Sequence, residues 1–411
     1  MLDGLFVLDL SRVLAGPYCT QLLADLGARV VKVEALRGDD TRGWGPPFVG
    51  DESAYFLSVN RGKQSLAVDL KDPRGRAAVR RLAERADVLV ENFKVGDLAR
   101  YGLDYPSLAE RNPGLVYASI TGFGQDGPRA PEPGYDAALQ ALSGLMELTG
   151  EEGRPPVKLG VAWIDVLTGS HAATGVLAAL VARGRSGKGA HLDVALFDVA
   201  LASLVNQAQS ALVTGEAPRR LGSAHPSIVP YQAFEAADGA LMIAVGNDAQ
   251  FRRLCEVLEL PGLGRDARFL DNAGRVRARD ALIPVLAHRV RERPRDAWLA
   301  ALRGAGVPAT PVATLPEALA DPQTIARGLV VEGEHPGVGR VRMVGSPLWH
   351  ARGPDGAALP LMPREGASPV PPRLGEHTRA VLREDLGMSV EEIDALARAG
   401  VIGTGTRPPE A

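Results

Sequence analysis

Residues 5–34, LFVLDLSRVLAGPYCTQLLADLGARVVKVE, decide the fold of the first half of this chain. The apolar run Leu5–Leu10 predicts a short strand, and Tyr18–Leu26 has the length and apolar content of a helix. Gly27 ends this helix, and Ala28–Glu34 predicts a second strand. A strand, a helix and a strand in this order predict two parallel strands joined by a crossover helix.

Further predicted strands repeat this arrangement along the chain. They are Ser65–Leu70, Ala86–Phe93, Leu115–Thr121 and His191–Leu196. Strands that alternate with helices indicate an α/β protein with a large, doubly wound parallel sheet of Rossmann-like type. From about Ala224 the pattern changes, and Asp238-Gly239 is predicted to turn an antiparallel hairpin in a smaller α+β domain.

The composition argues against several classes of protein. Lys plus Arg number 46 and Asp plus Glu number 49, so the net charge of −3 gives no general case for binding nucleic acid or a membrane surface. Cys19 and Cys255 lie far apart, and the seven histidines are scattered without an H-E-x-x-H motif. Neither a disulfide framework nor a metal site is therefore expected. Because we also find no signal segment or membrane span, we expect a cytoplasmic protein.

An isolated acid, Asp165, lies at a sharp change of pattern. The run Val157–Trp163 before it predicts an extended segment, and Val166–Ala182 after it predicts a long buried helix. Asp165 is thus expected at or near the helix N-cap. One interpretation is a simple cap for the free backbone N–H groups. The other is a nucleophile that the helix N-terminus keeps ionised at pH 7.

Polar residues gather where the predicted strands end. They are Ser11-Arg12, Glu34, Asn92-Phe93 and Thr121-Gly122. Ligands of doubly wound sheets bind beyond the carboxyl ends of the strands, so these residues are candidates for a binding site, although loops are polar in any protein. The turn after the first strand lacks G-x-G-x-x-G, the dinucleotide-binding fingerprint.

Eight stretches of the chain together carry a family resemblance. They are VLDLSRVLAGPYCTQLLADLGARVVKVE, GDDTR, NRGKQSLAVDL, ADVLVENFKVG, GYDAALQALSGLMELTG, PVKLGVAWIDVLTG, GRSGKGAHLDVAL and LGEHT. In this order they resemble the family III CoA-transferases, the CaiB/BaiF type that includes formyl-CoA transferase. One stretch alone would be a weak match, whereas eight in the family's order over nearly the whole chain are specific.

The resemblance implies that Asp165 is the catalytic nucleophile. It also implies a set of CoA contacts, which are Lys63, Asn92, Phe93, Arg100 and, near the adenine and phosphates, Arg37. Basic side chains can neutralise phosphates, and a phenylalanine ring offers an apolar face. The family's lysine two places before Tyr135 is Pro133 here, which leaves one ligand contact in doubt. Coenzyme A enters as a thioester substrate, and the resemblance implies no separate cofactor.

The reaction that the resemblance implies is a chain of acyl transfers. Ionised Asp165 attacks the donor thioester to form an aspartyl anhydride, and the released CoA thiolate then converts the anhydride into an aspartyl-CoA thioester. The acceptor carboxylate attacks this thioester, and the steps run in reverse. Backbone N–H groups of Gly122–Gly124, or before His225, are candidates for stabilising the oxyanions.

Two alternatives to a transferase are considered. The same fold includes α-methylacyl-CoA racemases, which carry a histidine base where this chain has Tyr135. A phenol has a pKa near 10 in water and is a poor base at pH 7, so Tyr135 favours the transferase. The second alternative is a catalytically inactive CoA-binding protein, which the presence of Asp165 disfavours.

The acceptor is expected to be a small dicarboxylate. The segment GSAHPSIVPYQAF resembles the transferases that use succinyl-CoA, and it lacks the glycine-run loop of the formyl and oxalate enzymes. His225 in this segment is a candidate for binding the distal carboxylate, and Tyr135 is a second candidate substrate contact. A hydrogen-bonded loop histidine is an equally good interpretation of His225.

The resemblance also implies an interlocked homodimer. The large CoA-binding domain would take residues 1–205 and be completed by the C-terminal tail 373–411. The small domain would take residues 225–330. Linkers at 206–224 and 331–372 would join them.

Overall fold

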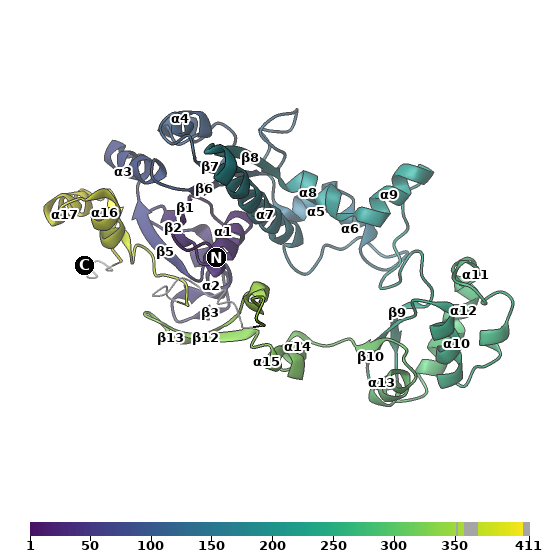
Figure 1. The fold of residues 1–411 in the computed structure, drawn as a ribbon. Helices are drawn as coiled ribbons and strands as arrows, with labels where there is room; N and C mark the ends of the chain where they lie inside the picture. Colours follow the sequence, from purple (N-terminus) through teal and green to yellow (C-terminus); the bar gives the residue numbers. More distant parts are fainter. Residues whose placement is uncertain (351, 357–368, 406–411) are drawn as a thin grey trace. The chain divides into compact units, whose positions relative to one another are not determined.

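The chain forms two compact units in the computed structural model, which describes residues 1–350, 352–356 and 369–405 (Figure 1). The small unit consists of Gly144–Leu159 and Gln209–Pro322, and the rest of the described chain forms the large unit. The small unit thus includes residues 144–159, which sequence analysis placed in the large domain. The part of the expected linker 331–372 that is described belongs to the large unit.

The large unit is built on one sheet with the strand order β14-β5-β2-β1-β6-β7-β8. Its strands are β1 (Phe6–Asp9), β2 (Arg29–Glu34), β5 (Lys63–Val68), β6 (Val88–Glu91), β7 (Val116–Thr121), β8 (Ala190–Ala195) and β14 (Ile402–Gly403). All neighbouring pairs are parallel except β14 with β5. Without β14 this is the 3-2-1-4-5-6 order of a doubly wound sheet, which confirms the predicted α/β class.

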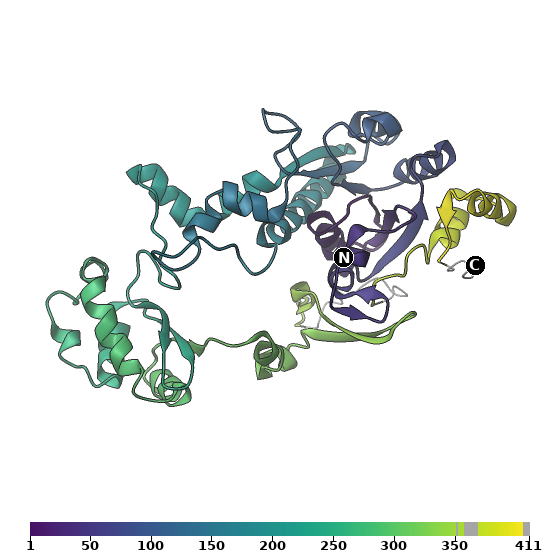
Figure 2. The ribbon, with the colours of Figure 1, turned by 180° about the vertical axis from the view of Figure 1, so that it is seen from behind.

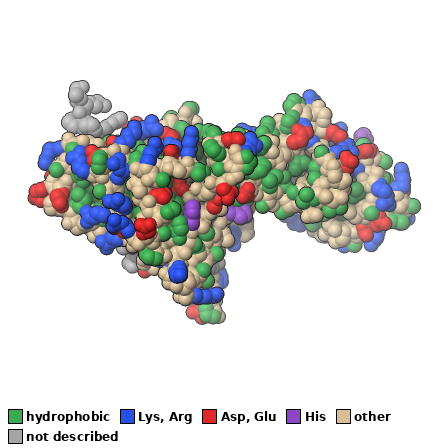
Figure 3. Space-filling view, turned by 90° about the horizontal axis from the view of Figure 1, so that it is seen from above, with side chains coloured by type: hydrophobic (Ala, Val, Ile, Leu, Met, Phe, Trp, Pro, Cys, Tyr) green, Lys and Arg blue, Asp and Glu red, His purple; other side chains and the backbone are tan. Residues whose placement is uncertain are grey.

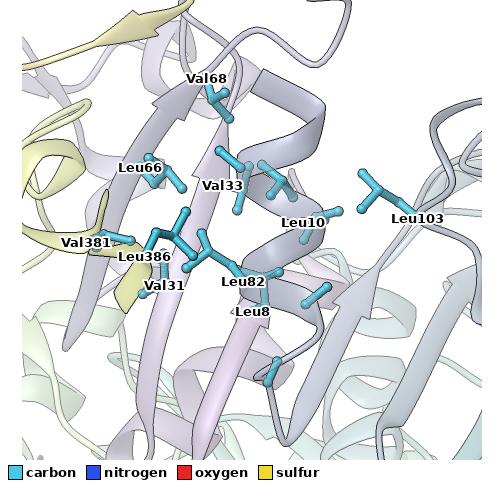
Figure 4. Close-up of a cluster of buried hydrophobic side chains, with 14 of the residues drawn as sticks. Leu8, Leu10, Val31, Val33, Leu66, Val68, Leu82, Leu103, Val381 and Leu386 are labelled. Carbon is cyan, nitrogen blue, oxygen red and sulfur yellow. The ribbon is translucent and has the colours of Figure 1, made fainter. Parts of the chain in front are cut away.

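Helices cover both faces of this sheet, as parallel strands require. One face packs against α1 (Ala15–Asp25) and α7 (Trp163–Ser186). The other packs against α3 (Pro73–Ala83), α4 (Tyr105–Ala109), α16 (Thr378–Leu386) and α17 (Val390–Arg398). Figure 4 shows the second face, where Leu8, Val31, Leu66, Leu82 and Leu386 meet in the core.

The end of the chain completes the large unit. Strand β14 adds to the edge of the sheet through β5, and α16 packs against α3 and β5. Figure 2 shows this C-terminal segment beside the N-terminal strands. Arg29 Nη1 and Nη2 donate to the two carboxylate oxygens of Asp385 at 2.6 and 2.7 Å, so β2 and α16 are also joined by a bidentate ion pair.

The large unit also contains several smaller elements. They are η1 (Asp40–Gly43), β3 (Phe48–Val49), β4 (Glu52–Ser53), α2 (Ala54–Val59), η2 (Ala99–Tyr101), α5 (Asp136–Leu142), α8 (Leu196–Ser203), β12 (Val330–His335), β13 (Gly339–Val344) and η4 (Pro347–His350). Helices α9 (Val205–Thr214) and α15 (Pro322–Ala326) span the points where the chain passes between units.

The small unit combines an antiparallel sheet with helices. Its strands are β9 (Tyr231–Glu235), β10 (Ala240–Ala244) and β11 (Ala309–Pro311), and the turn between β9 and β10 contains Asp238-Gly239 as predicted. Its helices are α6 (Leu145–Leu148), α10 (Asp248–Val257), η3 (Leu263–Arg265), α11 (Asn272–Arg277), α12 (Arg279–Val290), α13 (Arg295–Gly304) and α14 (Leu315–Leu319). On the face shown in Figure 3, acidic and basic side chains are interspersed.

The structure refines the expectations around Asp165. Residues 157–162 form no helix and pair with no strand, and Trp163 already belongs to the helix that follows. The helix that follows begins at Trp163, three residues earlier than predicted. By length and composition this helix, like α8 and α9 taken as one bent span, could cross a membrane, but it packs against α1, β7 and β8. It is only partly buried in the single chain, so the expectation of a long buried helix is not met.

The shared core predicts a difference between two substitutions. Leu66→Ala removes a fully buried side chain from the sheet, and should lower the free energy of unfolding by about 2–5 kcal/mol. Val390→Ala, at a half-exposed position on α17, should change it by less than about 0.5 kcal/mol. Urea unfolding followed by circular dichroism measures both. Equal effects of the two substitutions would contradict the packing described.

Candidate active site

The strand order reverses between β1 and β6, and the turns that follow these two strands meet there. Asn92 Nδ2 donates to the backbone oxygen of Arg12 at 2.7 Å, and the Arg12 N–H donates to Asn92 Oδ1 at 2.9 Å. Two cavities open at this point, and Arg12, Asp40 and Phe93 line both. Such a switch point is where open α/β sheets bind their ligands.

The first cavity, of about 300 Å³, combines charged side chains of both signs with apolar walls. Its basic side chains are Arg12, Lys32, Arg37, Lys71 and Arg100, its acidic ones are Glu34, Asp39, Asp40, Asp69 and Asp97, and its apolar ones include Leu10, Val68, Leu70, Phe93 and Tyr101. Arg12 and Arg37 both pair with Asp40, at 3.4 Å. The cavity thus brings together three predicted CoA contacts, namely Arg37, Phe93 and Arg100. Cations beside apolar rings suit an anionic ligand with a flat heterocycle.

The second cavity, of about 270 Å³, contains Asp165. Tyr135 and Asp136 line it from the N-terminus of α5, and Trp44 lines it from the loop after η1. The Trp44 ring meets Tyr55 edge-on, with ring centroids 5.2 Å apart. Burial and the nearby charges of Asp165 and Asp136 raise the pKa of Tyr55 to about 12, so its phenol stays neutral near the nucleophile.

Asp165 is not the N-cap of α7 but the third residue of the helix, whose N-cap position is Ala162. The cap comes instead from a distant acid. Asp136 Oδ1 accepts the N–H groups of Ile164 and Asp165 at 2.8 and 3.2 Å, and its other oxygen accepts from Gln140 Nε2 at 2.6 Å. Asp136 therefore fills the cap role that sequence analysis considered for Asp165.

Three glycines make this arrangement possible. A Cβ on Gly122, just after β7, would lie 2.6 Å from the Cα of Gly134. The segment that leads to Asp136 can approach the end of β7 this closely because neither residue carries a side chain. A Cβ on Gly169 would lie 2.5 Å from the backbone oxygen of Ala15. Helices α1 and α7 thus approach closely one turn after Asp165.

The expected ionisation of Asp165 needs correction. Burial raises the pKa of Asp165 to about 7, and the negative charge of Asp136 adds to this increase. The helix N-terminus does not offset it, because the carboxylate of Asp136 already accepts the first free N–H groups. Asp165 is therefore a poorly solvated acid that titrates near neutral pH, a property common among catalytic groups.

Lys63 lies beneath the cavities rather than in them, so a direct contact with CoA is not supported. Its side chain is fully buried, and its ammonium donates to Asp9 Oδ2 at 3.1 Å, to Asn60 Oδ1 at 2.9 Å and to the Pro17 backbone oxygen at 2.8 Å. Burial lowers the pKa of Lys63 to about 8. Its position makes it a structural cation under the turn that follows β1.

The remaining candidates lie in different places. Tyr135 is 71% exposed at the edge of the second cavity, as the N-cap residue of α5. His225 belongs to the small unit, where its Nδ1 accepts the Ser227 N–H at 3.0 Å. Among the expected oxyanion donors, the Gly124 N–H is already bound to Thr121 Oγ1 at 3.0 Å.

Sequence analysis missed Asp136, Lys71 and Trp44. The signal for Lys71 was its place just after a predicted strand, in line with the other strand-end residues. Sequence analysis considered Tyr135 but gave its neighbour Asp136 no role. A capping contact between residues 29 apart leaves no local pattern in the sequence. Trp44 lies in a loop without periodicity, and only the fold brings it to Asp165.

Comparison with known proteins identifies the family. A family model described as CoA-transferase family III matches residues 2–378. The chain belongs to this family. It is 43% identical to the human succinyl-CoA:glutarate CoA-transferase, over 98% of this chain and 90% of the relative. It is 45% identical to the succinate–glutarate CoA-transferase of Agrobacterium fabrum, over 93% and 95% of the two chains.

A solved structure agrees with this placement. A CaiB/BaiF family protein from Brucella suis is 46% identical and superposes with a TM-score of 0.81, covering 93% of this chain and 99% of that one. The resemblance stated from the sequence is thus confirmed, and the protein is a CoA-transferase with an α/β fold of the CaiB/BaiF type.

The two neighbouring acids predict a pH effect in this CoA-transferase. The ratio kcat/KM should rise with pH through about 7, because only ionised Asp165 can attack a thioester. In Asp136→Asn the amide oxygen can still cap α7, but the negative charge is lost. The pKa of Asp165 should then fall, and the rise in kcat/KM should move to lower pH.

Asp198→Asn is a matched control, because Asp198 is an exposed acid in the first turn of α8 and lines neither cavity. Its pH profile should coincide with that of the unmodified enzyme. A profile of Asp136→Asn that also coincides would show that Asp136 does not set the ionisation of Asp165.

Proposed function

We propose that this enzyme transfers CoA from succinyl-CoA to a small dicarboxylate through covalent intermediates on Asp165. One observation carries the proposal: the cavity that contains Asp165 shares Arg12, Asp40 and Phe93 with the first cavity, whose lining includes five basic side chains beside apolar ones. A CoA molecule whose phosphates lie among these cations can direct its thioester towards Asp165. The named activities of the human and Agrobacterium relatives supply the substrate class.

The first half of the reaction moves CoA onto the enzyme. A carboxylate oxygen of Asp165 attacks the thioester carbon, the carbon–sulfur bond breaks, and CoA leaves as a thiolate. The product is a mixed anhydride of Asp165 and the succinyl group. The thiolate then attacks the Asp165 carboxyl carbon and expels succinate, which leaves Asp165 as a CoA thioester.

The second half reverses these steps with the acceptor. An acceptor carboxylate oxygen attacks the Asp165 thioester and expels the thiolate, forming a new anhydride. The thiolate attacks the acceptor acyl carbon, and Asp165 leaves as a carboxylate. Each step exchanges one activated acyl group for another, so the proposed reaction requires neither ATP nor a metal ion.

The surroundings of Asp165 suit this role. A carboxylate that burial has deprived of water is a stronger nucleophile than a solvated one, and its pKa near 7 keeps a large ionised fraction at neutral pH. Asp136 fixes the first turn of α7 and thereby the direction of Asp165. The racemase alternative lacks such support, since exposed Tyr135 offers only a phenol as base.

His225 is proposed to bind the distal carboxylate of the acceptor. Because its Nδ1 accepts the Ser227 N–H, the neutral ring carries its proton on Nε2, where it can donate to a carboxylate. Arg279 supports the loop, with Nη2 donating to the His225 backbone oxygen at 2.7 Å. A second carboxylate that is withdrawn from water needs such a donor.

The enzyme is also proposed to act as an interlocked homodimer in the cytoplasm. Large apolar side chains are exposed on α7, α8 and α9, namely Val181, Leu201, Leu212 and Val213, and contact with a second copy would cover such positions. Both cysteines are buried free thiols, as is usual in a reducing compartment.

Asp165→Ala should abolish CoA transfer, since the proposed anhydride forms on the Asp165 carboxylate. Binding of free CoA, measured by calorimetry, should persist. Incubation of the unmodified enzyme with succinyl-CoA and hydroxylamine should modify Asp165, as read by peptide mass spectrometry. Asp198→Ala serves as a control with full turnover. Substantial turnover by Asp165→Ala would refute the covalent mechanism.

His225→Ala should reduce kcat/KM for glutarate by about tenfold to a hundredfold, the cost of one hydrogen bond to a charged group. Butyrate, which has no second carboxylate, should be affected little. Steady-state kinetics with both acceptors separate recognition from a general effect on the loop. Equal losses with glutarate and butyrate would exclude the recognition role.

A further inference from the structure

The turn between β1 and α1 has a strained backbone at the edge of the site. Val13 has a φ of 71°, in the left-handed region that β-branched residues rarely adopt because their side chains crowd the backbone. Val13 lines the cavity of Asp165, and its neighbour Arg12 lines both cavities. Strain that persists at such a place must be maintained by surrounding contacts.

Two side chains from other strand ends supply those contacts. Asn92, after β6, binds both backbone polar groups of Arg12. It accepts the Arg12 N–H at 2.9 Å and donates to the Arg12 backbone oxygen at 2.7 Å. Asp39, after β2, accepts the Val13 N–H at 3.2 and 3.3 Å. The turn is therefore held by side chains distant in sequence rather than by its own backbone.

Buried charges support the turn from below. The Ser11 N–H donates to Asp9 Oδ1 at 2.9 Å, and Lys32 Nζ donates to the Ser11 backbone oxygen at 2.8 Å. Lys32 also pairs with Asp39 at 2.8 Å, and both side chains are almost fully buried. These contacts fix the start of the turn at Ser11, so that the conformation of Arg12 and Val13 depends mainly on Asn92 and Asp39.

We propose that Asn92 is a positioning residue that keeps the Arg12–Val13 turn in its strained conformation. The turn places the Arg12 guanidinium 6.0 Å from the centre of the Phe93 ring, between the two cavities. It also sets where α1 begins, beside Asp165. The proposal rests on the proposed CoA transfer, and it assigns Asn92 a contact with the protein backbone instead of a direct contact with CoA.

The test exploits the freedom of glycine at positive φ. Asn92→Ala should lower kcat/KM by about tenfold to a hundredfold, because two hydrogen bonds that hold the turn are lost. Adding Val13→Gly should restore about tenfold of this loss, since glycine adopts a φ of 71° without steric cost and the turn then needs less support. Such non-additivity in a double-mutant cycle indicates that the two residues act on the same conformation.

The matched control is Val205→Gly in the Asn92→Ala background. Val205 is also a valine at positive φ, 34°, but it lines neither cavity, so this change should restore nothing. Calorimetry with free CoA gives a second measurement: affinity lost in Asn92→Ala should return with Val13→Gly. A loss that Val13→Gly leaves unchanged, in both kinetics and CoA affinity, would overturn the positioning role and favour direct contact.

Two further variants keep the test decisive. If Asn92→Ala does not fold, Asn92→Asp retains the acceptor for the Arg12 N–H but loses the donor to its oxygen. A smaller loss with the same restoration by Val13→Gly is then expected, and a loss without restoration would contradict the proposal. Asp165→Ala tests the covalent mechanism separately. If this variant keeps its turnover, the covalent mechanism is wrong, but the comparison of CoA affinities still tests the role of Asn92.

Discussion

The carboxylate of Asp136 at the N-terminus of α7 is the interaction on which the active site depends. It accepts the N–H groups of Ile164 and Asp165, and so fixes the first turn of the longest described helix. The same charge lies close enough to Asp165 to raise its pKa beyond the effect of burial. One group thus holds the backbone of the nucleophile in place and adds to the effect of burial on its ionisation.

This arrangement shows how a helix end can be used without activating an acid in the usual way. An exposed acid in the first turn of a helix is stabilised as an anion by the helix dipole. Here a second acid has taken that position, and the nucleophile is left half-buried and weakly solvated. The result is a carboxylate that is costly to ionise but reactive once ionised, which fits a group that must form and break anhydrides.

A cluster of buried charged side chains beneath the Arg12–Val13 turn has a structural role. Asp9, Lys32 and Lys63 lie on the face of the sheet that packs against α1, and none of them needs a ligand to be neutralised. Burial would raise the pKa of Asp9, but the charges of Lys63 and Lys32 outweigh it and the pKa is lowered. Removing one partner would leave an unpaired buried charge, which costs far more than an exposed ion pair. The cluster therefore forms a stiff base for the turn that carries Arg12 and Val13.

The sequence by itself determined the α/β class, the parallel strands of the large sheet and the hairpin of the small unit, because these depend on local apolar patterns and turn residues. It did not predict β14, the short antiparallel strand at the edge of the sheet. It also identified Asp165 and the residues that follow the strands. Only the tertiary structure decided what these residues do. Lys63 occupies the position of a CoA-binding lysine in the family motif, yet the fold buries it in an ion pair with Asp9. Asp136 caps a helix that begins 27 residues later. The strained turn at Val13 is held by Asn92 and Asp39, which follow two other strands. Such roles arise from the meeting of distant segments, and no local pattern of residues encodes them.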